Sequence, residues 1–360
     1  MQTVKAAVCV EHGKPLVIQD IQLADPKMGE VEVEIDAVAI CHSDISFQEG
    51  GFGGPVPAVF GHEAAGRITK LGEGVQGLEV GDHVCVTLIR ACGHCTSCGS
   101  GQPTICETPY DGTRGPLSQD GQPVFQAMAS GAFAEKVVVD QSQLCRIPAD
   151  LPKDVASLIS CGVITGVGAA ALAADIRVGQ DVVVIGAGGV GLNAIQGAVI
   201  AGARRVVAVD MLDEKLEVAK EFGATDVVSA REQKPWKLVK EILGRGADAV
   251  LVTVGVDAVY NQAPLYLAAG GNVVMVGMPH GDKTSSYSPL IMANQGQGFV
   301  GSKMGDVVIK RDIPWIIDLY KQGRLKLDEL ISGRYRFDQI NDAIENTKTG
   351  AARRNVIVMR

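Results

Sequence analysis

Val182-Val-Val-Ile185, followed by Gly186-Ala-Gly-Gly-Val-Gly191, is the stretch of sequence that decides the fold. A short apolar run that ends at a glycine cluster predicts a buried strand and a tight turn. The residues from there to about Ala201 are small and mostly apolar, which predicts a helix. The pattern G-x-G-x-x-G between a strand and a helix is typical of a turn that binds the pyrophosphate of a dinucleotide.

Each glycine of this turn has a separate physical role. Gly186 permits the tight turn, Gly188 lets the backbone approach a pyrophosphate at the positive end of the helix, and Gly191 allows close packing of helix on strand. Gly189 and Val190 complete the turn. The alternative is a plain strand-to-helix turn, but the strand and helix on either side favour the dinucleotide site.

Asp210 ends the next predicted strand, Val206–Val209. A carboxylate at this position accepts hydrogen bonds from the hydroxyls of the adenosine ribose but repels a 2′-phosphate. Met211 and Leu212 follow, and no arginine is adjacent. The sequence therefore favours NAD over NADP.

Strands and helices alternate from about Leu151 onward, which predicts a doubly wound parallel sheet in an α/β domain. Further elements predicted in this part are a helix at Lys215–Phe222 and strands at Asp226–Val228, Ala249–Val254 and Asn272–Val276.

The first part of the chain instead predicts a mostly β domain. Val31–Val38 alternates apolar and polar residues, and Ala64–Lys70 continues in the same style. Glycine and proline are frequent between Gly50 and Pro57, which indicates turns. A tail with helices at Pro314–Gln322 and Phe337–Lys348 leads to a last strand at Asn355–Met359.

Charge and hydropathy exclude several classes of partner. The 360 residues carry a net charge of −8 and contain no basic stretch that would neutralise phosphates, so nucleic acid is not expected as a partner. Val155–Ala174 and Val182–Ala203 are long enough to span a membrane, but both are rich in glycine and alanine, and the second reads as strand, turn and helix. We therefore expect no membrane span and a cytoplasmic location.

Four of the nine cysteines, Cys92, Cys95, Cys98 and Cys106, lie in one short segment. An odd number of cysteines in a chain without a signal peptide is a poor framework for disulfides. Four thiolates at this spacing suit a closed, tetrahedral, structural zinc site. The alternatives are four unrelated thiols, or His94 in place of one of the cysteines.

A second set of candidate ligands is scattered along the chain: Cys41, His62 and Cys161. Taken singly, each residue could have only a structural role, because cysteines often pack as small apolar residues and histidines occur in cores. Taken together, two cysteines and one histidine form a catalytic zinc set with an open fourth position. Asp44 and Glu63 lie close in sequence to two of these ligands, and carboxylates commonly orient metal-bound histidine.

The chain resembles the zinc-containing alcohol dehydrogenases of the medium-chain dehydrogenase/reductase family over nearly its whole length. The resemblance implies a GroES-like catalytic domain at 1–162, completed by 304–360, around a Rossmann domain at 163–303, with the active site in the cleft between them. The shared motifs are Cys41-His-Ser-Asp44, Gly61-His-Glu63, Cys92 to Cys106, Cys161-Gly162, Gly186 to Gly191, and Asp210.

The resemblance also implies roles for individual residues. Cys41, His62 and Cys161 would hold the catalytic zinc, and Glu63 would lie beside the zinc and bind it transiently. Asp44 would be the partner of His62, and Ser43 would take the alcohol proton. His42 and Arg354 match positions that contact the pyrophosphate, and Lys215 matches one beside the adenosine ribose. The positions that match the substrate pocket are Phe52, Leu88, Phe133 and Met278.

The implied reaction is reversible hydride transfer between a primary or secondary alcohol and NAD, giving an aldehyde or ketone, in a homodimer or homotetramer with two zinc ions per chain. Apolar positions between Cys106 and Phe133 favour an apolar alcohol. Ser46 departs from the family, because many members have a histidine there as the last proton acceptor.

Three alternatives stay open. A polyol or amino-alcohol dehydrogenase would share the fold, although many polyol enzymes lack one cysteine of the catalytic set. A nicotinoprotein would hold NAD permanently and recycle it with a second substrate. A non-catalytic NAD-binding protein would tend to lose zinc ligands, and this chain keeps them all.

Overall fold

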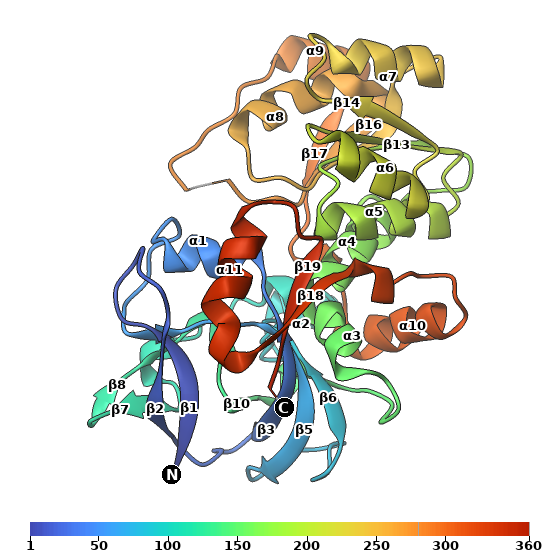
Figure 1. The fold of residues 1–360 in the computed structure, drawn as a ribbon. Coiled ribbons are helices and arrows are strands. Elements are labelled where there is room, and N and C mark those ends of the chain that lie inside the picture. The colour runs from blue at the N-terminus through green and yellow to red at the C-terminus, as the bar shows by residue number, and fades with distance from the viewer. Residues whose placement is uncertain (280, 360) are drawn as a thin grey trace. The chain divides into compact units, whose positions relative to one another are not determined.

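The structure, a computed structural model, describes residues 1–279 and 281–359 and divides into two compact units (Figure 1). Residues 163–307 form one unit, and the described parts of the chain up to Gly162 and from Val308 form the other. Residues 304–307 group with the second unit, whereas the sequence placed the boundary before residue 304.

The first unit contains two sheets. The smaller one has six strands in the order β8-β7-β2-β1-β4-β9. It is mainly antiparallel, and its long pair joins β1 to β2 from Gln2↔Leu23 to Val8↔Val17. The strands are β1 (Gln2–Cys9), β2 (Val17–Leu23), β4 (Ala58–Val59), β7 (Leu117–Gln119), β8 (Gln122–Pro123) and β9 (Phe125–Gln126).

The larger sheet of this unit has seven strands in the order β11-β6-β5-β3-β19-β18, with β10 also paired to β3. In Figure 1 the last strand of the chain, β19, lies between β3, from the beginning of the chain, and β18. The strands are β3 (Glu30–Ala39), β5 (Glu63–Leu71), β6 (His83–Val86), β10 (Lys136–Asp140), β11 (Leu144–Arg146), β18 (Ile331–Arg336) and β19 (Arg354–Val358).

The register of the larger sheet gathers residues from distant parts of the chain. Ala39 of β3 pairs with Glu63 of β5 on one side and with Val356 of β19 on the other. The residues that follow β3, precede β5 and begin β19 therefore lie at one end of the sheet. The core beneath is built from the alternating side chains of β3, and Val31, Val33 and Ile35 are buried.

The helices of the first unit are short, except for α10. The chain turns from β3 into α1 at Cys41, whose backbone N–H donates to the Asp44 carboxylate at 3.1 Å. This contact satisfies one of the donors left free at a helix start. The helices are α1 (His42–Gln48), α2 (Thr96–Gly99), α3 (Lys153–Leu158), α10 (Ile309–Lys321) and α11 (Ile340–Lys348).

A continuous helical stretch runs over Lys153–Ala173. It contains α3, a π-helical turn at Ile159–Val163, α4 (Ile164–Gly168) and a second π-helical turn at Ala169–Ala173. The stretch is long and apolar enough to cross a membrane, but 83% of its most apolar window is buried inside the protein. Burial of this kind is what a core helix requires, since a lipid-facing helix would leave its apolar side chains exposed.

The second unit is built on one six-stranded sheet in which every neighbouring pair is parallel, in the order β14-β13-β12-β15-β16-β17. This strand order is that of dinucleotide-binding folds, so the predicted doubly wound sheet is confirmed. The strands are β12 (Asp181–Ile185), β13 (Arg205–Asp210), β14 (Asp226–Ser229), β15 (Ala247–Val252), β16 (Leu267–Met275) and β17 (Gly298–Gly301).

Apolar central strands hold this sheet together. Val183, Val207, Val250 and Val273, one from each of four neighbouring strands, are completely buried. The helices that connect the strands are α5 (Gly189–Ile200), α6 (Asp213–Glu221), α7 (Pro235–Leu243), α8 (Asp257–Gln262) and α9 (Pro289–Gln295).

Candidate metal and cofactor sites

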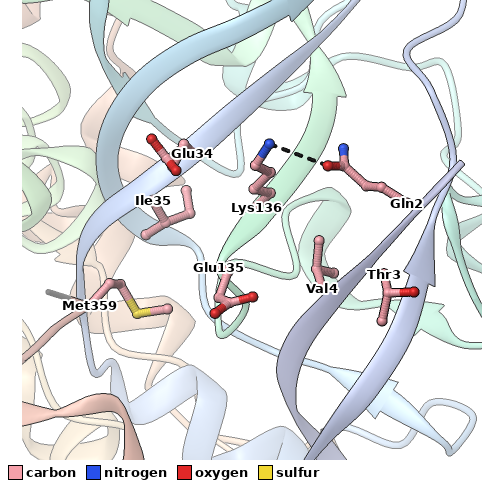
Figure 2. Close-up of a pocket in the computed structure, with 8 residues that line it drawn as sticks. All are labelled: Gln2, Thr3, Val4, Glu34, Ile35, Glu135, Lys136 and Met359. Atoms are coloured by element: carbon pink, nitrogen blue, oxygen red, sulfur yellow. Dashed lines mark hydrogen bonds between the residues drawn. The ribbon is translucent and has the colours of Figure 1, made fainter.

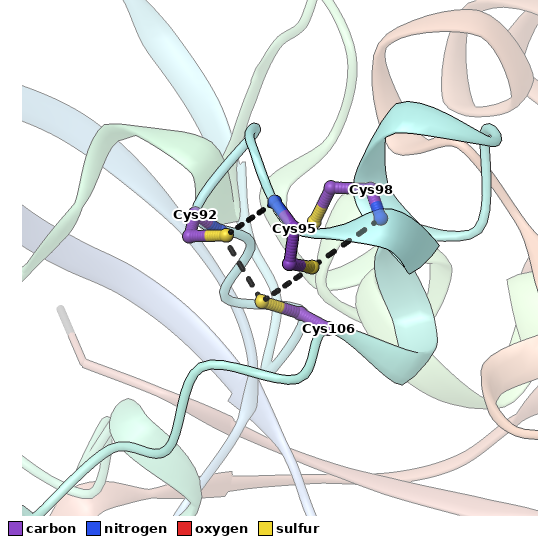
Figure 3. Close-up of side chains that lie close together, drawn as sticks. All are labelled: Cys92, Cys95, Cys98 and Cys106. Atoms are coloured by element: carbon purple, nitrogen blue, oxygen red, sulfur yellow. Dashed lines mark hydrogen bonds between the residues drawn. The ribbon is translucent and has the colours of Figure 1, made fainter.

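The four clustered cysteines surround a common point (Figure 3). Their sulfurs all lie within 4.8 Å of one another, and the Cys95 and Cys106 sulfurs are 4.0 Å apart. A tetrahedral zinc with Zn–S bonds of about 2.3 Å places its sulfurs about 3.8 Å apart. The cysteine cluster therefore has the dimensions of a closed zinc site.

Backbone N–H groups support the sulfurs of this cluster. The N–H of Cys95 donates to the Cys92 sulfur at 3.3 Å, and the N–H of Cys98 donates to the Cys95 sulfur at 3.4 Å. The N–H of Cys92 donates to the Cys106 sulfur at 3.3 Å. His94 is exposed, and its Nδ1 lies 2.9 Å from the carbonyl of Cys92. The four cysteines thus offer the number of sulfurs that a closed zinc site takes, and His94 is not part of this group.

The scattered set also converges. One ligand atom from each of Cys41, His62, Glu63 and Cys161 lies within 4.8 Å of the others, and all four residues are buried. Cys41 follows β3, His62 and Glu63 stand at the start of β5, and Cys161 lies in a π-helical turn. Such turns occur frequently at functional sites. The sequence carries no signal for this turn, because it is a local departure from an otherwise regular helix.

Asp44 fixes the orientation of the His62 ring. Its Oδ1 lies 3.1 Å from His62 Nδ1 and accepts the backbone N–H of Gly61 at 2.9 Å, while its Oδ2 accepts the N–H of Cys41. The other ring nitrogen, Nε2, is buried and has no hydrogen-bond partner among the described residues. A buried nitrogen without a partner is costly unless a ligand satisfies it. The residues present therefore fit a zinc ion bound to Nε2 and the two sulfurs.

Electrostatics in this group favour the metal-binding form of the cysteine. The pKa of Cys41 is held well below its usual range by hydrogen bonding to Cys161 and by His62 and Arg354, against the opposing effect of burial. Burial alone would lower the pKa of His62, but Asp44 and Cys41 outweigh it and raise the pKa to about 10. Cys41 is therefore set up as a thiolate, the form that binds a metal.

Glu63 has a second neighbour, Arg354. Both side chains are buried, and the guanidinium Nη2 forms an ion pair with Glu63 Oε2. A Cβ at residue 162 would lie 3.1 Å from Arg354 Nη1, so Gly162 leaves room for the guanidinium. Within the first unit the Arg354 side chain faces Glu63, and the contact with the pyrophosphate that the resemblance implies stays a prediction. Nothing in the sequence indicates the Arg354–Glu63 ion pair. The two residues meet only because β19 pairs with β3 and β3 pairs with β5.

The structure places the other residues of the Cys41 motif at the start of α1. The Ser43 hydroxyl oxygen lies 3.7 Å from the Cys41 sulfur, so the serine borders the group of candidate ligands. His42 is exposed at the first position of the helix. Ser46, one turn further on, is half-buried.

The structure describes all four residues of the predicted substrate pocket, three in the first unit and one in the second. Phe52 is half-buried and packs edge-on against Phe47, with ring centroids 5.3 Å apart, and Leu88 is half-buried. Phe133 is completely buried, and its ring lies against Gly61. Met278 is 64% exposed and belongs to the second unit.

A hollow of about 270 Å³ in the first unit involves none of the predicted site residues (Figure 2). Its charged side chains already have partners, since Lys136 Nζ lies 3.3 Å from Gln2 Oε1 and Glu34 pairs with Arg67. The residues that line it are Gln2, Thr3, Val4, Glu34, Ile35, Glu135, Lys136 and Met359.

In the second unit, the glycine turn has the features of a dinucleotide site. Gly186 has a φ of +98°, which favours glycine, and a Cβ at Gly191 would lie 1.8 Å from the Gly186 carbonyl oxygen. A Cβ at Gly188 would meet no atom of the described residues within 4 Å, so this glycine faces space that a phosphate could fill. Gly189 begins α5, and Val190 and Gly191 are in its first turn.

The Asp210 carboxylate lies beside the same turn. Its Oδ2 accepts the backbone N–H of Ala187 at 2.7 Å, and its Oδ1 accepts the N–H of Leu212 at 3.0 Å. Lys215 is half-buried on α6, the helix that follows Asp210. A further residue, Thr253, which directly follows β15, contacts the turn, and no sequence motif marks it.

Comparisons with known proteins identify the chain. A zinc-binding dehydrogenase family model matches residues 189–322, and an alcohol dehydrogenase GroES-like domain model matches residues 27–149. The alcohol dehydrogenase class-P of Arabidopsis thaliana is 34% identical, with 99% of this chain and 97% of that protein covered. The NDMA-dependent alcohol dehydrogenase of Amycolatopsis methanolica is 35% identical, with 98% of each covered.

A solved structure agrees with these relatives. The benzyl alcohol dehydrogenase of Acinetobacter calcoaceticus superposes with a TM-score of 0.94, at 30% identity and with 100% of both chains covered. The fold and the ligand sets define a zinc-dependent oxidoreductase that uses a nicotinamide cofactor. The chain belongs to the zinc-containing medium-chain alcohol dehydrogenase family. The expected GroES-like and Rossmann fold class is confirmed.

Proposed function

We propose that this alcohol dehydrogenase interconverts an alcohol and its aldehyde or ketone with NAD, and that it carries two zinc ions per chain. Cys41, His62 and Cys161 would hold the catalytic ion, and the four-cysteine cluster would hold the structural one. The observation that carries the proposal is the buried, partnerless Nε2 of His62, turned by Asp44 toward two buried cysteines and Glu63. Substituting Cys161 tests the catalytic assignment.

The residues around this group account for the chemistry. When bound, the zinc makes an alcohol hydroxyl more acidic, and the nicotinamide takes up hydride. Ser43, beside the Cys41 sulfur, would accept the alcohol proton. Since Ser46 cannot act as a base near neutral pH, the relay would end at Ser43, the cofactor ribose and water. Glu63, held by Arg354, would stay near enough to bind the zinc transiently.

We propose NAD rather than NADP because the Asp210 carboxylate stands beside the turn, where a 2′-phosphate would meet its negative charge. The expected preference in kcat/KM is about tenfold or more, which corresponds to about 1.4 kcal/mol. Asp210→Ala should reduce the ratio of kcat/KM for NAD to kcat/KM for NADP. Equal use of NAD and NADP by the unmodified enzyme would contradict the assignment.

An apolar alcohol is the proposed substrate class. The similar solved enzyme is named for benzyl alcohol, and in this chain the aromatic ring of Phe52 packs edge-on against that of Phe47 on α1. A panel of primary, secondary, aromatic and terpenoid alcohols tests this. Higher kcat/KM for polyols than for aromatic alcohols would overturn it.

A relative named for dependence on NDMA favours one second candidate, a nicotinoprotein that keeps its NAD bound throughout turnover. Native mass spectrometry of purified enzyme distinguishes this nicotinoprotein from a dehydrogenase that exchanges NAD freely. Loss of NAD during dilution and recovery of activity with added NAD supports the freely exchanging dehydrogenase, whereas NAD retained on every chain supports the nicotinoprotein.

We propose a homodimer, or a tetramer made of two such pairs, in the cytoplasm. Strand β17 is an edge of its sheet, and exposed edges are normally covered. Tyr287, Leu290 and Ile291 are each more than half exposed, and the Tyr287 ring lies 5.3 Å from that of Phe299 on β17. Light scattering tests the pairing, and a monomer at all concentrations would contradict it. The cytoplasmic location agrees with the cysteines, since none of the nine, all within the described residues, forms a disulfide, as expected in a reducing compartment.

A further inference from the structure

We propose that Thr253 is a positioning residue that holds the phosphate-binding turn of the cofactor site in its binding conformation before the cofactor arrives. The inference rests on the proposed cofactor role of the Gly186–Gly191 turn. Thr253 directly follows β15, which lies beside β12 at the point where the strand order reverses. In folds of this kind the ligand binds at that point, beyond the carboxyl ends of the strands.

The Thr253 hydroxyl bonds to the turn itself. It donates to the Gly186 carbonyl at 2.9 Å and lies 3.1 Å from the carbonyl of Ile185, the last residue of β12. The backbone N–H of Thr253 also donates to Ile185, at 3.0 Å. One side chain thus closes the gap between β15 and the turn after β12.

The glycines leave the space that the hydroxyl fills. A Cβ at Gly186 would lie 2.8 Å from Thr253 Oγ1, and a Cβ at Gly191 would lie 3.0 Å from it. The hydroxyl therefore sits between the start of the turn and the first turn of α5. Gly186 and Gly191 therefore leave room for the Thr253 hydroxyl oxygen, in addition to the room that the turn leaves for the cofactor.

The other side of the turn is held by β13. The N–H of Gly186 donates to the Val209 carbonyl at 2.8 Å, and the N–H of Ala187 donates to the Asp210 carboxylate. Thr253 supplies the complementary contact, a donor to a turn carbonyl. With both sides fixed, the positive φ of Gly186 is maintained without the cofactor, and binding does not have to order the turn.

Thr253→Val tests the hydroxyl, because valine has nearly the same shape. Thr253→Ser keeps the hydroxyl, and Thr225→Val is the matched control. Thr225 Oγ1 also bonds to a backbone carbonyl, that of Val206 at 3.2 Å, but it precedes β14 at the opposite end of the sheet. The readouts are the NADH dissociation constant from fluorescence, kcat and KM for NAD, and hydrogen exchange of the 181–192 backbone without cofactor.

We expect Thr253→Val to raise the NADH dissociation constant and the KM for NAD about five- to tenfold, the usual effect of losing one buried hydrogen bond. The kcat at saturating NAD should stay within about twofold, since the chemistry is untouched. Exchange at 181–192 should rise in Thr253→Val, while Thr253→Ser and Thr225→Val should behave like the unmodified enzyme. If Thr253→Val does not fold, the same difference is expected between Thr253→Ala and Thr253→Ser.

Binding within twofold of normal in Thr253→Val, or equally weak binding in Thr253→Ser, would overturn the proposal. An unmodified enzyme that binds neither NADH nor NADPH would instead overturn the cofactor role of the turn. The two failures are thereby distinguishable.

Discussion

The four-cysteine cluster and the buried group around Cys41 both gather side chains that could hold a metal ion, but their surroundings differ. The cluster is half-exposed, is built from one short segment of the chain, and its sulfurs accept hydrogen bonds from backbone N–H groups. The buried group draws its ligands from three distant segments and has Asp44, Glu63 and Arg354 around it. A closed set of thiolates suits a stabilising ion, whereas a buried mixed set with charged neighbours suits chemistry.

The largest expected difference between the two sites follows from Cys161→Ser. This change should abolish activity, because it removes a ligand of the catalytic ion, and it should leave the thermal midpoint within a few degrees. Steady-state kinetics and calorimetry measure both. Cys145→Ala is the control, since Cys145 is buried in the same unit but outside both ligand sets, and it should stay active. Substantial activity in Cys161→Ser would remove the basis for the catalytic assignment.

Cys95→Ser should show the reverse pattern, with the main loss in stability. A structural zinc contributes directly to folding, so we expect the thermal midpoint to fall by about 10 °C or more. His94→Ala in the same segment should leave the thermal midpoint unchanged, because the four cysteines would supply all four ligands of the structural zinc. A stable Cys95→Ser enzyme that still binds two zinc ions would show that the cluster is not a metal site.

Ser43→Ala tests proton transfer beside the buried group. Loss of a positioned proton carrier should reduce kcat by about 10²-fold or more. Ser46→Ala on the same helix should have little effect, and His42→Gln should mainly weaken NAD binding. The pH profile of kcat with a saturating alcohol gives the decisive comparison. If His42→Gln removes a limb near neutral pH without changing NAD affinity, His42 is the terminal base instead.

Asp44→Asn should have a smaller effect, because it alters the support of a ligand and not the ligand itself. Asparagine keeps one acceptor oxygen but loses the charge that holds the His62 ring with Nε2 toward the metal. We expect a loss of about 10- to 100-fold in zinc affinity or activity. Competition with a zinc chelator measures the affinity. An unchanged affinity would show that His62 is oriented by its packing alone.

The same contrast explains which features the sequence could predict. The cysteine cluster and the glycine turn are local, since their residue types and spacing carry the chemistry within a few positions. The core strands could also be predicted, because a short apolar run such as Val182–Ile185 that ends at a glycine turn indicates a buried strand. None of these three predictions needed knowledge of which strands pair.

Features that depend on strand register could not be predicted in this way. Arg354 meets Glu63 only because β19 pairs with β3 and β3 with β5. Thr253 contacts Gly186 because β15 lies beside β12. The short edge strands β17 and β18 carry too few apolar residues to stand out from loops. The complete burial of Phe133 likewise depends on its packing against Gly61, which hydropathy does not reveal.

Zinc content tests the central claim most directly, namely that two separate ligand sets hold two ions with different roles. Elemental analysis of the well-folded, unmodified enzyme should give two zinc ions per chain. Cys161→Ser should give one, at nearly unchanged thermal stability. One zinc or none in the unmodified enzyme, or two in Cys161→Ser, would contradict the claim.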